Sequence, residues 1–153
     1  KKRSSFYHVD FSFDELRLGG SAFAQSLDKV GSDVPSVKNP EYFRAAFNAV
    51  QQLVKEGLLL AGHDISAGGL ITCLLEMCFA NVEGGMTICL DGFKNTNDLV
   101  KILFAENPGI ILQVADDKAK RMYEIFDEAG VACLKIGKPT DERHIRVRSE
   151  ILP

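Results

Sequence analysis

The sequence lacks the features that mark membrane proteins, secreted proteins and nucleic-acid binders. Its 153 residues contain no apolar run long enough to span a bilayer and no signal peptide. Charge of one sign is not in excess, since 18 Lys and Arg stand against 21 Asp and Glu, for a net charge of −3. A chain this close to neutral is not typical of a general binder of nucleic acid or of anionic lipid. We therefore expect a cytoplasmic protein with neither a nucleic-acid nor a membrane partner.

The cysteine and histidine patterns of metal sites are also missing. None of the four cysteines forms a C-x-x-C pair, and the three histidines lie far apart in the chain. His63 is interpreted as a packed or hydrogen-bonded neighbour rather than a ligand. Every cysteine lies inside an apolar segment, where a free thiol behaves as a small hydrophobic side chain. The residues predicted to be reduced and buried are Cys73, Cys78, Cys89 and Cys133.

No sequence motif of an enzyme active site is complete. The chain has no G-x-S-x-G nucleophile elbow, no G-x-x-x-x-G-K-[ST] phosphate loop and no G-x-G-x-x-G dinucleotide motif. No cysteine lies in the polar surroundings that would activate it as a nucleophile. We therefore assign no catalytic residue to this chain.

The composition that is present fits one globular domain. Hydrophobic residues make up 46% of the chain and charged residues 25%, and 153 residues allow a sizeable core. We predict a single domain over residues 1–153. The first residue is Lys1 rather than Met, so we interpret the chain as a processed product or as a piece of a longer protein.

Strands and helices alternate in the predicted secondary structure. Short apolar or alternating segments predict strands at residues 6–13, 58–61, 86–91, 110–114, 131–137 and 144–148. Longer periodic or apolar segments predict helices at residues 39–57, 70–80, 96–104 and 116–130. This interleaving predicts a fold between the α/β and α+β classes, in which helices cover a mixed sheet.

The best-marked helix is the one at residues 39–57. Asn39 is its predicted N-cap, Pro40 occupies the first turn, and Gly57 ends it. Apolar residues recur at spacings of three and four, so one stripe of the helix is expected to be buried. That stripe consists of Phe43, Ala46, Phe47, Val50, Leu53 and Val54.

Two of the predicted strands differ in how deeply they are expected to lie. The strand at residues 58–61 is uniformly apolar and is predicted to be buried. The strand at residues 144–148 alternates between polar and apolar residues. It is predicted to lie at an edge or on the surface of the sheet, with Ile145 and Val147 pointing inward.

Residues 62–70 join a predicted strand to a predicted helix. Ser66 is a natural N-cap for that helix, and Gly68 and Gly69 leave its first N–H groups open to close approach. A helix start of this kind favours an anion such as phosphate, and Asp64 just upstream can hold a magnesium ion that the phosphate shares. In the simpler interpretation, the serine is an ordinary cap and the glycines only permit tight packing.

Other polar or glycine positions are open to two interpretations. Glu76 lies on an apolar helix, where it either meets a metal or a cationic partner or, more commonly for such a residue, faces solvent. Glu106 and Asn107 precede a predicted strand, where they either contact a ligand or only shape the turn. Gly19 and Gly20 form either a tight turn into a short helix or a second phosphate loop, and packing is the favoured interpretation.

Several motifs, in order, resemble the AIR-synthase-related superfamily. Residues 18–25, L-G-G-S-A-F-A-Q, resemble its L-G-[GA]-[ST]-A-[LF]-A-Q, and residues 33–35, D-V-P, precede the first long helix as expected. Residues 63–70, H-D-I-S-A-G-G-L, resemble H-D-x-S-D-G-G-L, and residues 74–80, L-L-E-M-C-F-A, resemble L-x-E-M-A-F-A. Residues 103–109, L-F-A-E-N-P-G, resemble L-F-x-E-E-x-G. The set covers nearly the whole chain and most resembles the C-terminal domain of the phosphoribosylformylglycinamidine synthase family.

The resemblance implies an AIR-synthase C-terminal-domain-like fold and a set of cofactors. Enzymes of that family use ATP, Mg²⁺ and glutamine to convert formylglycinamide ribonucleotide to formylglycinamidine ribonucleotide in purine biosynthesis. Asp64 is similar to a magnesium ligand of the family, and Ser66 is similar to a residue that contacts bound ATP or ADP. Gly68 and Gly69 join Ser66 as candidate nucleotide-binding residues. Ala67 stands where the family often has Asp, so any polar contact from that position is lost.

Much of such an enzyme lies outside these residues. The implied partners are the other AIR-synthase-like domains and a glutaminase domain of the same polypeptide, with a small-molecule nucleotide as ligand. The chain alone is therefore expected to be inactive. The alternatives are AIR synthase itself, a relative similar to selenophosphate synthetase or thiamine-phosphate kinase, and a structural domain with a vestigial nucleotide pocket.

Overall fold

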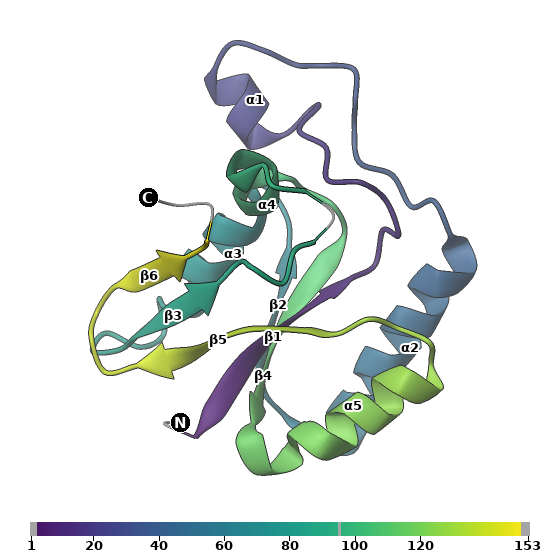
Figure 1. Cartoon of the computed structure of the whole chain (residues 1–153), viewed down its shortest axis with the longest axis vertical. Helices are drawn as coiled ribbons and strands as arrows, with labels where there is room; N and C mark the ends of the chain where they lie inside the picture. The colour runs from purple at the N-terminus through teal and green to yellow at the C-terminus, as the bar shows by residue number, and fades with distance from the viewer. Residues whose placement is uncertain (1–2, 95, 151–153) are drawn as a thin grey trace.

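The computed structural model describes residues 3–94 and 96–150, which form one mixed sheet with helices on both faces (Figure 1). The strands are β1 (Ser4–Asp10), β2 (Leu59–Ile65), β3 (Gly85–Cys89), β4 (Gly109–Ala115), β5 (Leu134–Thr140) and β6 (Ile145–Arg148). Their order in the six-stranded sheet is β2-β4-β1-β5-β3-β6, and all neighbours are antiparallel except β3 and β6. The predicted mixed sheet covered by helices is confirmed.

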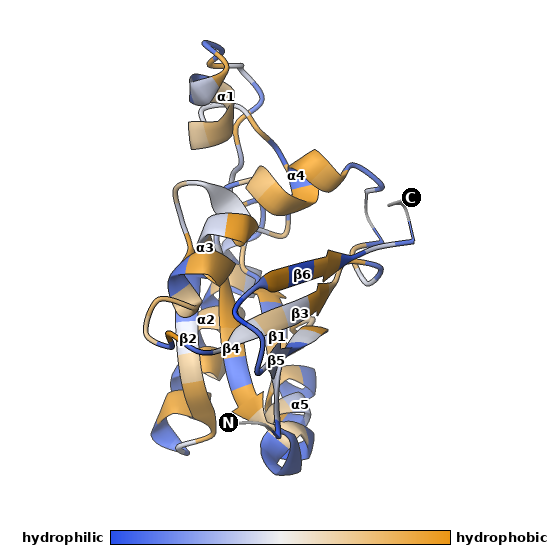
Figure 2. Ribbon diagram, turned by 90° about the vertical axis from the view of Figure 1, so that its left-hand side faces the viewer, coloured by the Kyte–Doolittle hydropathy of each residue, from blue (hydrophilic) through white to orange (hydrophobic). Residues whose placement is uncertain are grey.

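The helices divide between the two faces of the sheet. They are α1 (Ala22–Ser26), α2 (Pro40–Lys55), α3 (Gly69–Met77), α4 (Leu99–Phe104) and α5 (Ala119–Glu128), the last preceded by the 3-10 turn η1 (Asp116–Lys118). Helices α2 and α5 pack on one face, and α3 and α4 pack on the other. Helix α1 lies on an arm that projects beyond α4 (Figure 2), so the glycine pair before it is a turn into a short helix.

Strand β1 connects the two cores, because its side chains alternate between the two faces of the sheet. Tyr7 and Val9 belong to the core under α2 and α5. Phe6 belongs to the core under α3 and α4. All three are at most 3% exposed, which explains why this segment is apolar at successive positions rather than at every second one.

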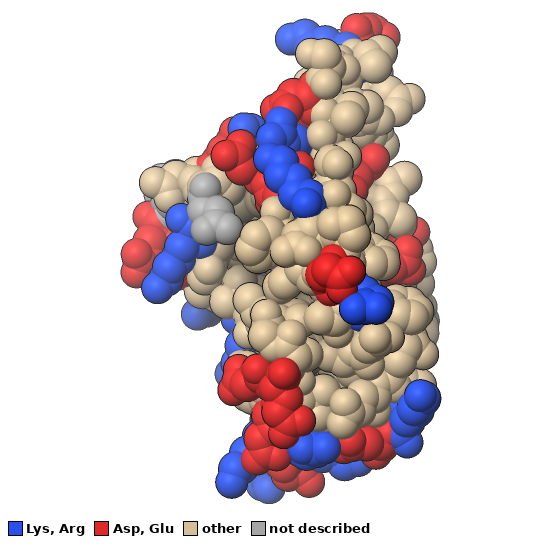
Figure 3. Space-filling model, turned by 90° about the vertical axis from the view of Figure 1, so that its right-hand side faces the viewer, with Lys and Arg blue, Asp and Glu red and all other residues tan. Residues whose placement is uncertain are grey.

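Helix α2 begins as predicted, but the face that it buries against the sheet is narrower than the predicted stripe. Asn39 caps it by accepting a hydrogen bond from the Tyr42 N–H at 3.1 Å, and Pro40 is its first residue. The buried positions are Ala46, Ala49, Val50 and Leu53. The prediction is wrong for Phe47 and Val54, which are 47% and 56% exposed. Each follows a buried residue by one position, about 100° around the helix axis, and the molecular surface over α2 carries few charged side chains (Figure 3).

Strand β2 is longer and more exposed than predicted. It lies at an edge of the sheet and pairs with β4 alone. Leu58 is buried just before the strand, but Leu60 and Ala61 are exposed, so the prediction of a buried strand at residues 58–61 is wrong. An edge strand has a neighbour on one side only and keeps more contact with water. The strand continues to Ile65, so residues 62–65 of the predicted strand–helix junction belong to the sheet.

Strand β6 forms the opposite edge of the sheet, as predicted. It runs parallel to β3, with Ile145 beside Met86 and Val147 beside Ile88. Ile145 and Val147 are half-buried and pack against the core under α3 and α4. No helix in the described part of the chain is both long and apolar enough to cross a membrane.

All four cysteines are free thiols, but their burial differs. Cys73 is buried, Cys78 and Cys133 are half-buried, and Cys89 is exposed. The prediction of a buried thiol is therefore wrong for Cys89. This residue ends β3, where its thiol leaves the sheet and donates a hydrogen bond to the Asp91 carboxylate at 3.1 Å.

Candidate functional site

Asp64 lies near the end of β2 with its side chain in water. In the ladder between β2 and β4, Asp64 pairs with Ile110 and His63 pairs with Ile111, so the Asp64 and His63 side chains point to opposite faces of the sheet. The Asp64 side chain is 78% exposed, and its carboxylate lies 3.8 Å from Nδ1 of His63. The carboxylate is therefore open to a cation from solvent.

His63 points toward α3 and meets Glu76 there. Its Nδ1 donates a hydrogen bond to the Asp64 carbonyl oxygen at 2.8 Å, because that oxygen can only accept. Its Nε2 lies 3.2 Å from a carboxylate oxygen of Glu76, whose side chain is 38% exposed. This arrangement agrees with the prediction that His63 is a hydrogen-bonded neighbour. It also gives Glu76 a partner, where exposure to solvent alone was the favoured expectation.

Ser66 does not cap α3, contrary to the sequence prediction. The N-cap of α3 is Gly68, with no hydrogen bond from a side chain. Gly68 and Gly69 have φ angles of 89° and 72°, in the left-handed region that glycine adopts without strain. This double turn lets the Ser66 carbonyl oxygen accept a hydrogen bond from the Gly69 N–H at 3.0 Å. The Ser66 side chain stays exposed beside the end of β2.

Glu106 occupies the position that was expected for an anion. One of its carboxylate oxygens accepts hydrogen bonds from the Gly68 N–H at 2.7 Å and from the Ala22 N–H at 2.8 Å. Ala22 is the first residue of α1, so the starts of α1 and α3 meet at one carboxylate. Glu106 therefore does more than shape its turn, and the Gly68 N–H that phosphate was expected to use already has a partner.

Close packing explains two of the motif glycines. A Cβ atom on Gly69 would lie 2.7 Å from the backbone of Phe104, so α3 can approach α4 this closely only at a glycine. A Cβ atom on Gly19 would lie 2.5 Å from the carbonyl oxygen of Asp33, across the arm that carries α1. The close contact that the simpler interpretation expected of these glycines is present at both positions.

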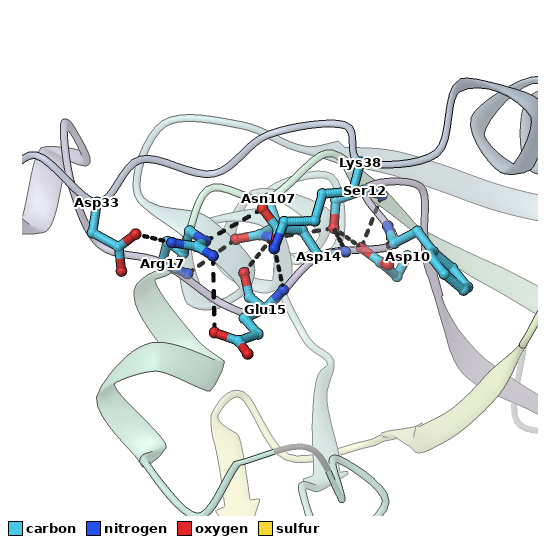
Figure 4. Close-up of polar contacts among 9 residues, drawn as sticks. Asp10, Ser12, Asp14, Glu15, Arg17, Asp33, Lys38 and Asn107 are labelled. Carbon is cyan, nitrogen blue, oxygen red and sulfur yellow. Dashed lines mark hydrogen bonds and ion pairs between the residues drawn. The ribbon is translucent and has the colours of Figure 1, made fainter.

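Asn107 ties the loop after β1 to the loop before β4 (Figure 4). Its side chain is buried, and Nδ2 donates hydrogen bonds to Ser12 Oγ at 3.1 Å and to the Glu15 carbonyl oxygen at 3.0 Å. Its Oδ1 accepts a hydrogen bond from the Arg17 N–H at 3.3 Å. Asn107 is therefore a structural residue of this loop cluster, in which both its amide NH₂ group and its amide oxygen already have partners.

An ion-pair network that the sequence analysis missed continues this loop. Asp14 has a 1% exposed side chain and lies 2.7 Å from Lys38 Nζ and 3.3 Å from Arg17 Nε. The hydrogen bond from Lys38, with smaller help from Arg17, holds the pKa of Asp14 below its usual value. Arg17 also pairs with Asp33 (Figure 4). The partners are 3 to 24 positions from Asp14 in the chain and share no periodicity, so no sequence pattern marks the network.

The exposed carboxylate of Asp64 could hold a magnesium ion together with ligands from outside this chain. Within residues 3–94 and 96–150, no three His, Cys, Asp or Glu side chains are grouped closely enough to hold a metal. The candidate site therefore offers the metal one carboxylate, that of Asp64. Mg²⁺ is commonly bound through one or two carboxylates together with phosphate oxygens and water, so one exposed carboxylate suits a metal that arrives with a nucleotide.

Curated relatives match most of this chain but only a small part of their own length. The human phosphoribosylformylglycinamidine synthase is 38% identical over 88% of the chain, which covers 10% of the human protein. A probable phosphoribosylformylglycinamidine synthase of Caenorhabditis elegans is 39% identical over 91% of the chain, which covers 11% of that protein. The chain thus spans about a tenth of the length of these relatives.

Solved structures and a family model agree on the fold. PurL of Thermotoga maritima, in a structure with ATP, has a TM-score of 0.72 and 18% identity, with 99% of this chain and 24% of that chain covered. Thiamine-monophosphate kinase of Stenotrophomonas maltophilia has a TM-score of 0.56 and 13% identity, with 99% of this chain and 52% of that chain covered. The model of the AIR synthase related protein, C-terminal domain, matches residues 12–150. The chain therefore belongs to the AIR-synthase-related family, as a C-terminal domain.

Proposed function

We propose that this chain is one domain of a phosphoribosylformylglycinamidine synthase, an ATP-dependent ligase of purine biosynthesis. Such an enzyme converts formylglycinamide ribonucleotide to formylglycinamidine ribonucleotide with nitrogen taken from glutamine. The observation that carries the proposal is the 38% identity to the human enzyme over 88% of the chain. The other AIR-synthase-like domains and the glutaminase domain of such an enzyme belong to further residues of a longer polypeptide.

Within that polypeptide, Asp64 and Ser66 form one wall of a pocket for Mg²⁺ and ATP or ADP. Both side chains are exposed, and the end of β2 brings them to the same edge of the sheet. When bound at Asp64, the metal supplies the largest local charge for holding phosphate oxygens. Gly68 and Gly69 contribute a surface without side chains, since their N–H groups already donate to Glu106 and Ser66.

Two other functions remain as candidates. A kinase similar to thiamine-monophosphate kinase is supported by the fold alone, at 13% identity. A structural domain with a vestigial pocket is supported by the hydrogen bond from Gly68 to Glu106, since an internal carboxylate fills the position expected for phosphate. Measurement of bound nucleotide distinguishes the structural domain from the other two.

The test compares nucleotide retention in the longer polypeptide that contains this chain. Bound nucleotide is released by denaturation and quantified for the wild type, for Asp64→Asn and for Ser66→Ala. We expect Asp64→Asn to lose more nucleotide than Ser66→Ala. Removal of the Asp64 carboxylate weakens the binding of the metal ion, and the charge of that ion dominates the binding of the phosphate groups. Asp117→Asn, at an exposed carboxylate on η1, is the matched control and should retain nucleotide like the wild type. Equal retention in the wild type and in Asp64→Asn would exclude the metal role.

The 153-residue chain alone should show no ligase activity with Mg-ATP and either glutamine or ammonia. Phosphoryl transfer requires metal, nucleotide and acceptor to be positioned together, and this chain offers one wall of such a site. Formation of the amidine product by the purified chain would contradict this expectation.

A further inference from the structure

The arm that carries α1 has a defined conformation although little of it is buried. It consists of residues 13–38 and projects beyond α4 at one end of the molecule (Figures 1 and 2). None of the five residues of α1 is buried, and every residue from Gln25 to Val34 is exposed. A segment with so few buried contacts is not held in place by a hydrophobic core. Its conformation therefore comes from other contacts.

Backbone hydrogen bonds fix two segments of the arm against each other. The Gly19 N–H donates to the Asp33 carbonyl oxygen at 2.9 Å, and the Gly20 N–H donates to the Val30 carbonyl oxygen at 2.6 Å. A Cβ atom on Gly31 would lie 3.2 Å from the Cα atom of Gly19, so the two segments meet with little room for a side chain between them. The backbone itself therefore gives the arm its shape.

The end of α4 and the loop before β4 anchor the arm to the body of the domain. The ring of Phe104 stacks on the ring of Phe23, with the centroids 4.6 Å apart and the planes at 26°. Glu106 accepts a hydrogen bond from the N–H of Ala22, the first residue of α1, at 2.8 Å. These contacts hold the arm at a fixed place relative to the sheet, so its tip is presented to solvent in one orientation.

The tip of the arm, residues 27–34, presents three apolar side chains to solvent. Leu27 is 54% exposed, Val30 is 69% exposed and Val34 is 52% exposed. Single exposed apolar residues are common, but three within eight positions on a projecting arm are typical of a contact site. Because the arm is already ordered, a partner that covers these side chains does not have to meet the entropic cost of ordering them. The tip is therefore suited to docking.

The charge of the tip indicates what kind of surface it fits. Asp28 and Lys29 carry opposite charges, and Asp33 pairs with Arg17. On the face drawn in Figure 3, most of the arm at the top of the molecule carries no charge. A tip that is apolar and close to neutral gives no attraction to nucleic acid or to an anionic surface. It fits an apolar groove on another protein surface.

The length of the relatives indicates where such a groove lies. This chain covers 10% of the human relative and 52% of the thiamine-monophosphate kinase chain, so about half or more of each of those proteins lies outside the matched part. The family match over residues 12–150 includes the whole arm. The arm is therefore part of a domain whose matched relatives contain further chain that can receive it.

We propose that the tip of the arm docks into an apolar groove on another domain of the same longer polypeptide. Leu27, Val30 and Val34 enter the groove, while Phe104 and Glu106 keep the arm in position for it. This inference rests on the proposed function in one respect only, namely that the chain is a domain of a longer polypeptide.

The first test compares hydrogen exchange of the backbone amides at residues 25–34 in the 153-residue chain and in the longer polypeptide. We expect exchange to be at least about tenfold slower in the longer polypeptide, because docking removes these amides from solvent. Equal exchange in the two proteins would overturn the proposal. Exchange that slows in the 153-residue chain as its concentration rises would assign the tip to a second copy, and would also overturn the proposal.

The second test uses the same measurement on two variants of the longer polypeptide. Val30→Asp should restore most of the fast exchange, because docking would bury a carboxylate in an apolar groove. Val30 is exposed, so its replacement does not threaten the fold of the domain. The matched control is Val82→Asp, at a 65% exposed valine before β3, which should leave exchange at the arm slow. Slow exchange in Val30→Asp, or equally fast exchange in both variants, would overturn the proposal.

Ligase activity of the longer wild-type polypeptide separates this proposal from the proposed function. Slow exchange at the arm without formation of the amidine product would contradict the proposed function and support the docking of the arm. Formation of the amidine product with fast exchange at the arm would support the proposed function and overturn the docking.

Discussion

Glu106 shows how a single side chain changes what a backbone site can bind. The glycine pair at the start of α3 has the features of an anion site, and the anion that lies there is the Glu106 carboxylate of the same chain. The same oxygen also accepts the N–H that begins α1. Negative charge at two helix starts is favourable, so Glu106 stabilises the junction between the projecting arm and the body of the domain.

Replacement of Glu106 should therefore destabilise the fold in a graded way. Glu106→Ala leaves the N–H groups of Gly68 and Ala22 without their acceptor, and we expect a loss of about 1–3 kcal/mol in the free energy of unfolding. Glu106→Gln keeps an acceptor oxygen and removes the charge, so its loss should be smaller. Urea denaturation of both variants measures this, with Glu83→Ala at an exposed carboxylate as the control. Equal stabilities of the Ala and Gln variants would contradict the assigned role.

His8 is a residue whose protonation the fold opposes. Burial lowers its pKa from 6.5 to about 4, with a smaller opposing effect from Asp10. Between about pH 6.5 and pH 4 the unfolded chain binds more protons at this position than the folded chain does, so stability falls as the pH is lowered through that window. Below the pKa of His8 in the folded protein, His8 is protonated in both the folded and the unfolded chain, and no further stability is lost through this residue.

This linkage predicts a pH-dependent stability that His8→Gln removes. We expect the His8 contribution to fall by about 1–2 kcal/mol between pH 7 and pH 4, less than the full shift implies, because the ring is half-buried and partly screened by solvent. Urea denaturation at several pH values measures the slope in the wild type and in the variant. If both proteins show the same pH dependence, His8 is not the responsible group.

At the scale of elements, periodicity located helices and strands better than it located their faces. The N-cap at Asn39 and the start of α2 follow from local chemistry, and they were predicted correctly. The exposure of Phe47 depends instead on how much of the α2 surface the sheet covers. The local spacing of apolar residues does not predict that width. The exposure of β2 likewise depends on strand order, which places it at an edge.

In the candidate site, too, the sequence predicted local features better than contacts between distant parts of the chain. The motif at residues 63–70 marked Asp64 and Ser66, and the structure leaves both side chains exposed at one end of β2. Ser66 does not cap α3 because the left-handed Gly68 takes the N-cap position and the left-handed Gly69 begins the helix. The bond from Gly68 to Glu106 joins residues 38 positions apart and could not be read from either motif.

The corrected face of α2 gives a prediction at the scale of this element. Leu53 is fully buried in the core under α2 and α5, so Leu53→Ala should cost about 2–5 kcal/mol in the free energy of unfolding. Phe47 is 47% exposed, so Phe47→Ala should cost clearly less, although the phenylalanine is the larger side chain. The denaturant midpoints of the two variants, each compared with the wild type, measure these losses of stability. A larger loss for Phe47→Ala would restore the wider stripe that periodicity alone suggests.

At the scale of the whole molecule, two hydrophobic cores share one sheet. The core under α2 and α5 and the core under α3 and α4 lie on opposite faces, and β1 supplies residues to both. Loss of either core removes packing from the central strand on which the other depends. A small domain built in this way is expected to unfold in one cooperative step.

The distribution of tyrosine and cysteine provides a separate probe for each core. The chain has three tyrosines and no tryptophan, and Tyr7, Tyr42 and Tyr123 all lie in or against the core under α2 and α5. Cys73 lies in the other core. Burial, with smaller effects from Asp64 and Glu76, raises the pKa of the Cys73 thiol to about 12, so the thiol reacts slowly until unfolding exposes it.

We therefore predict that urea unfolding followed by tyrosine fluorescence and by labelling of Cys73 gives the same midpoint. Peptide mapping by mass spectrometry assigns the label to Cys73 and separates it from the exposed Cys89, which should react in the folded protein and serves as the internal control. Coincident midpoints are expected because β1 cannot keep its packing on one face while the other face opens. A labelling midpoint at lower urea than the tyrosine midpoint would show that the core under α3 and α4 opens by itself, and that the sheet does not couple the two faces.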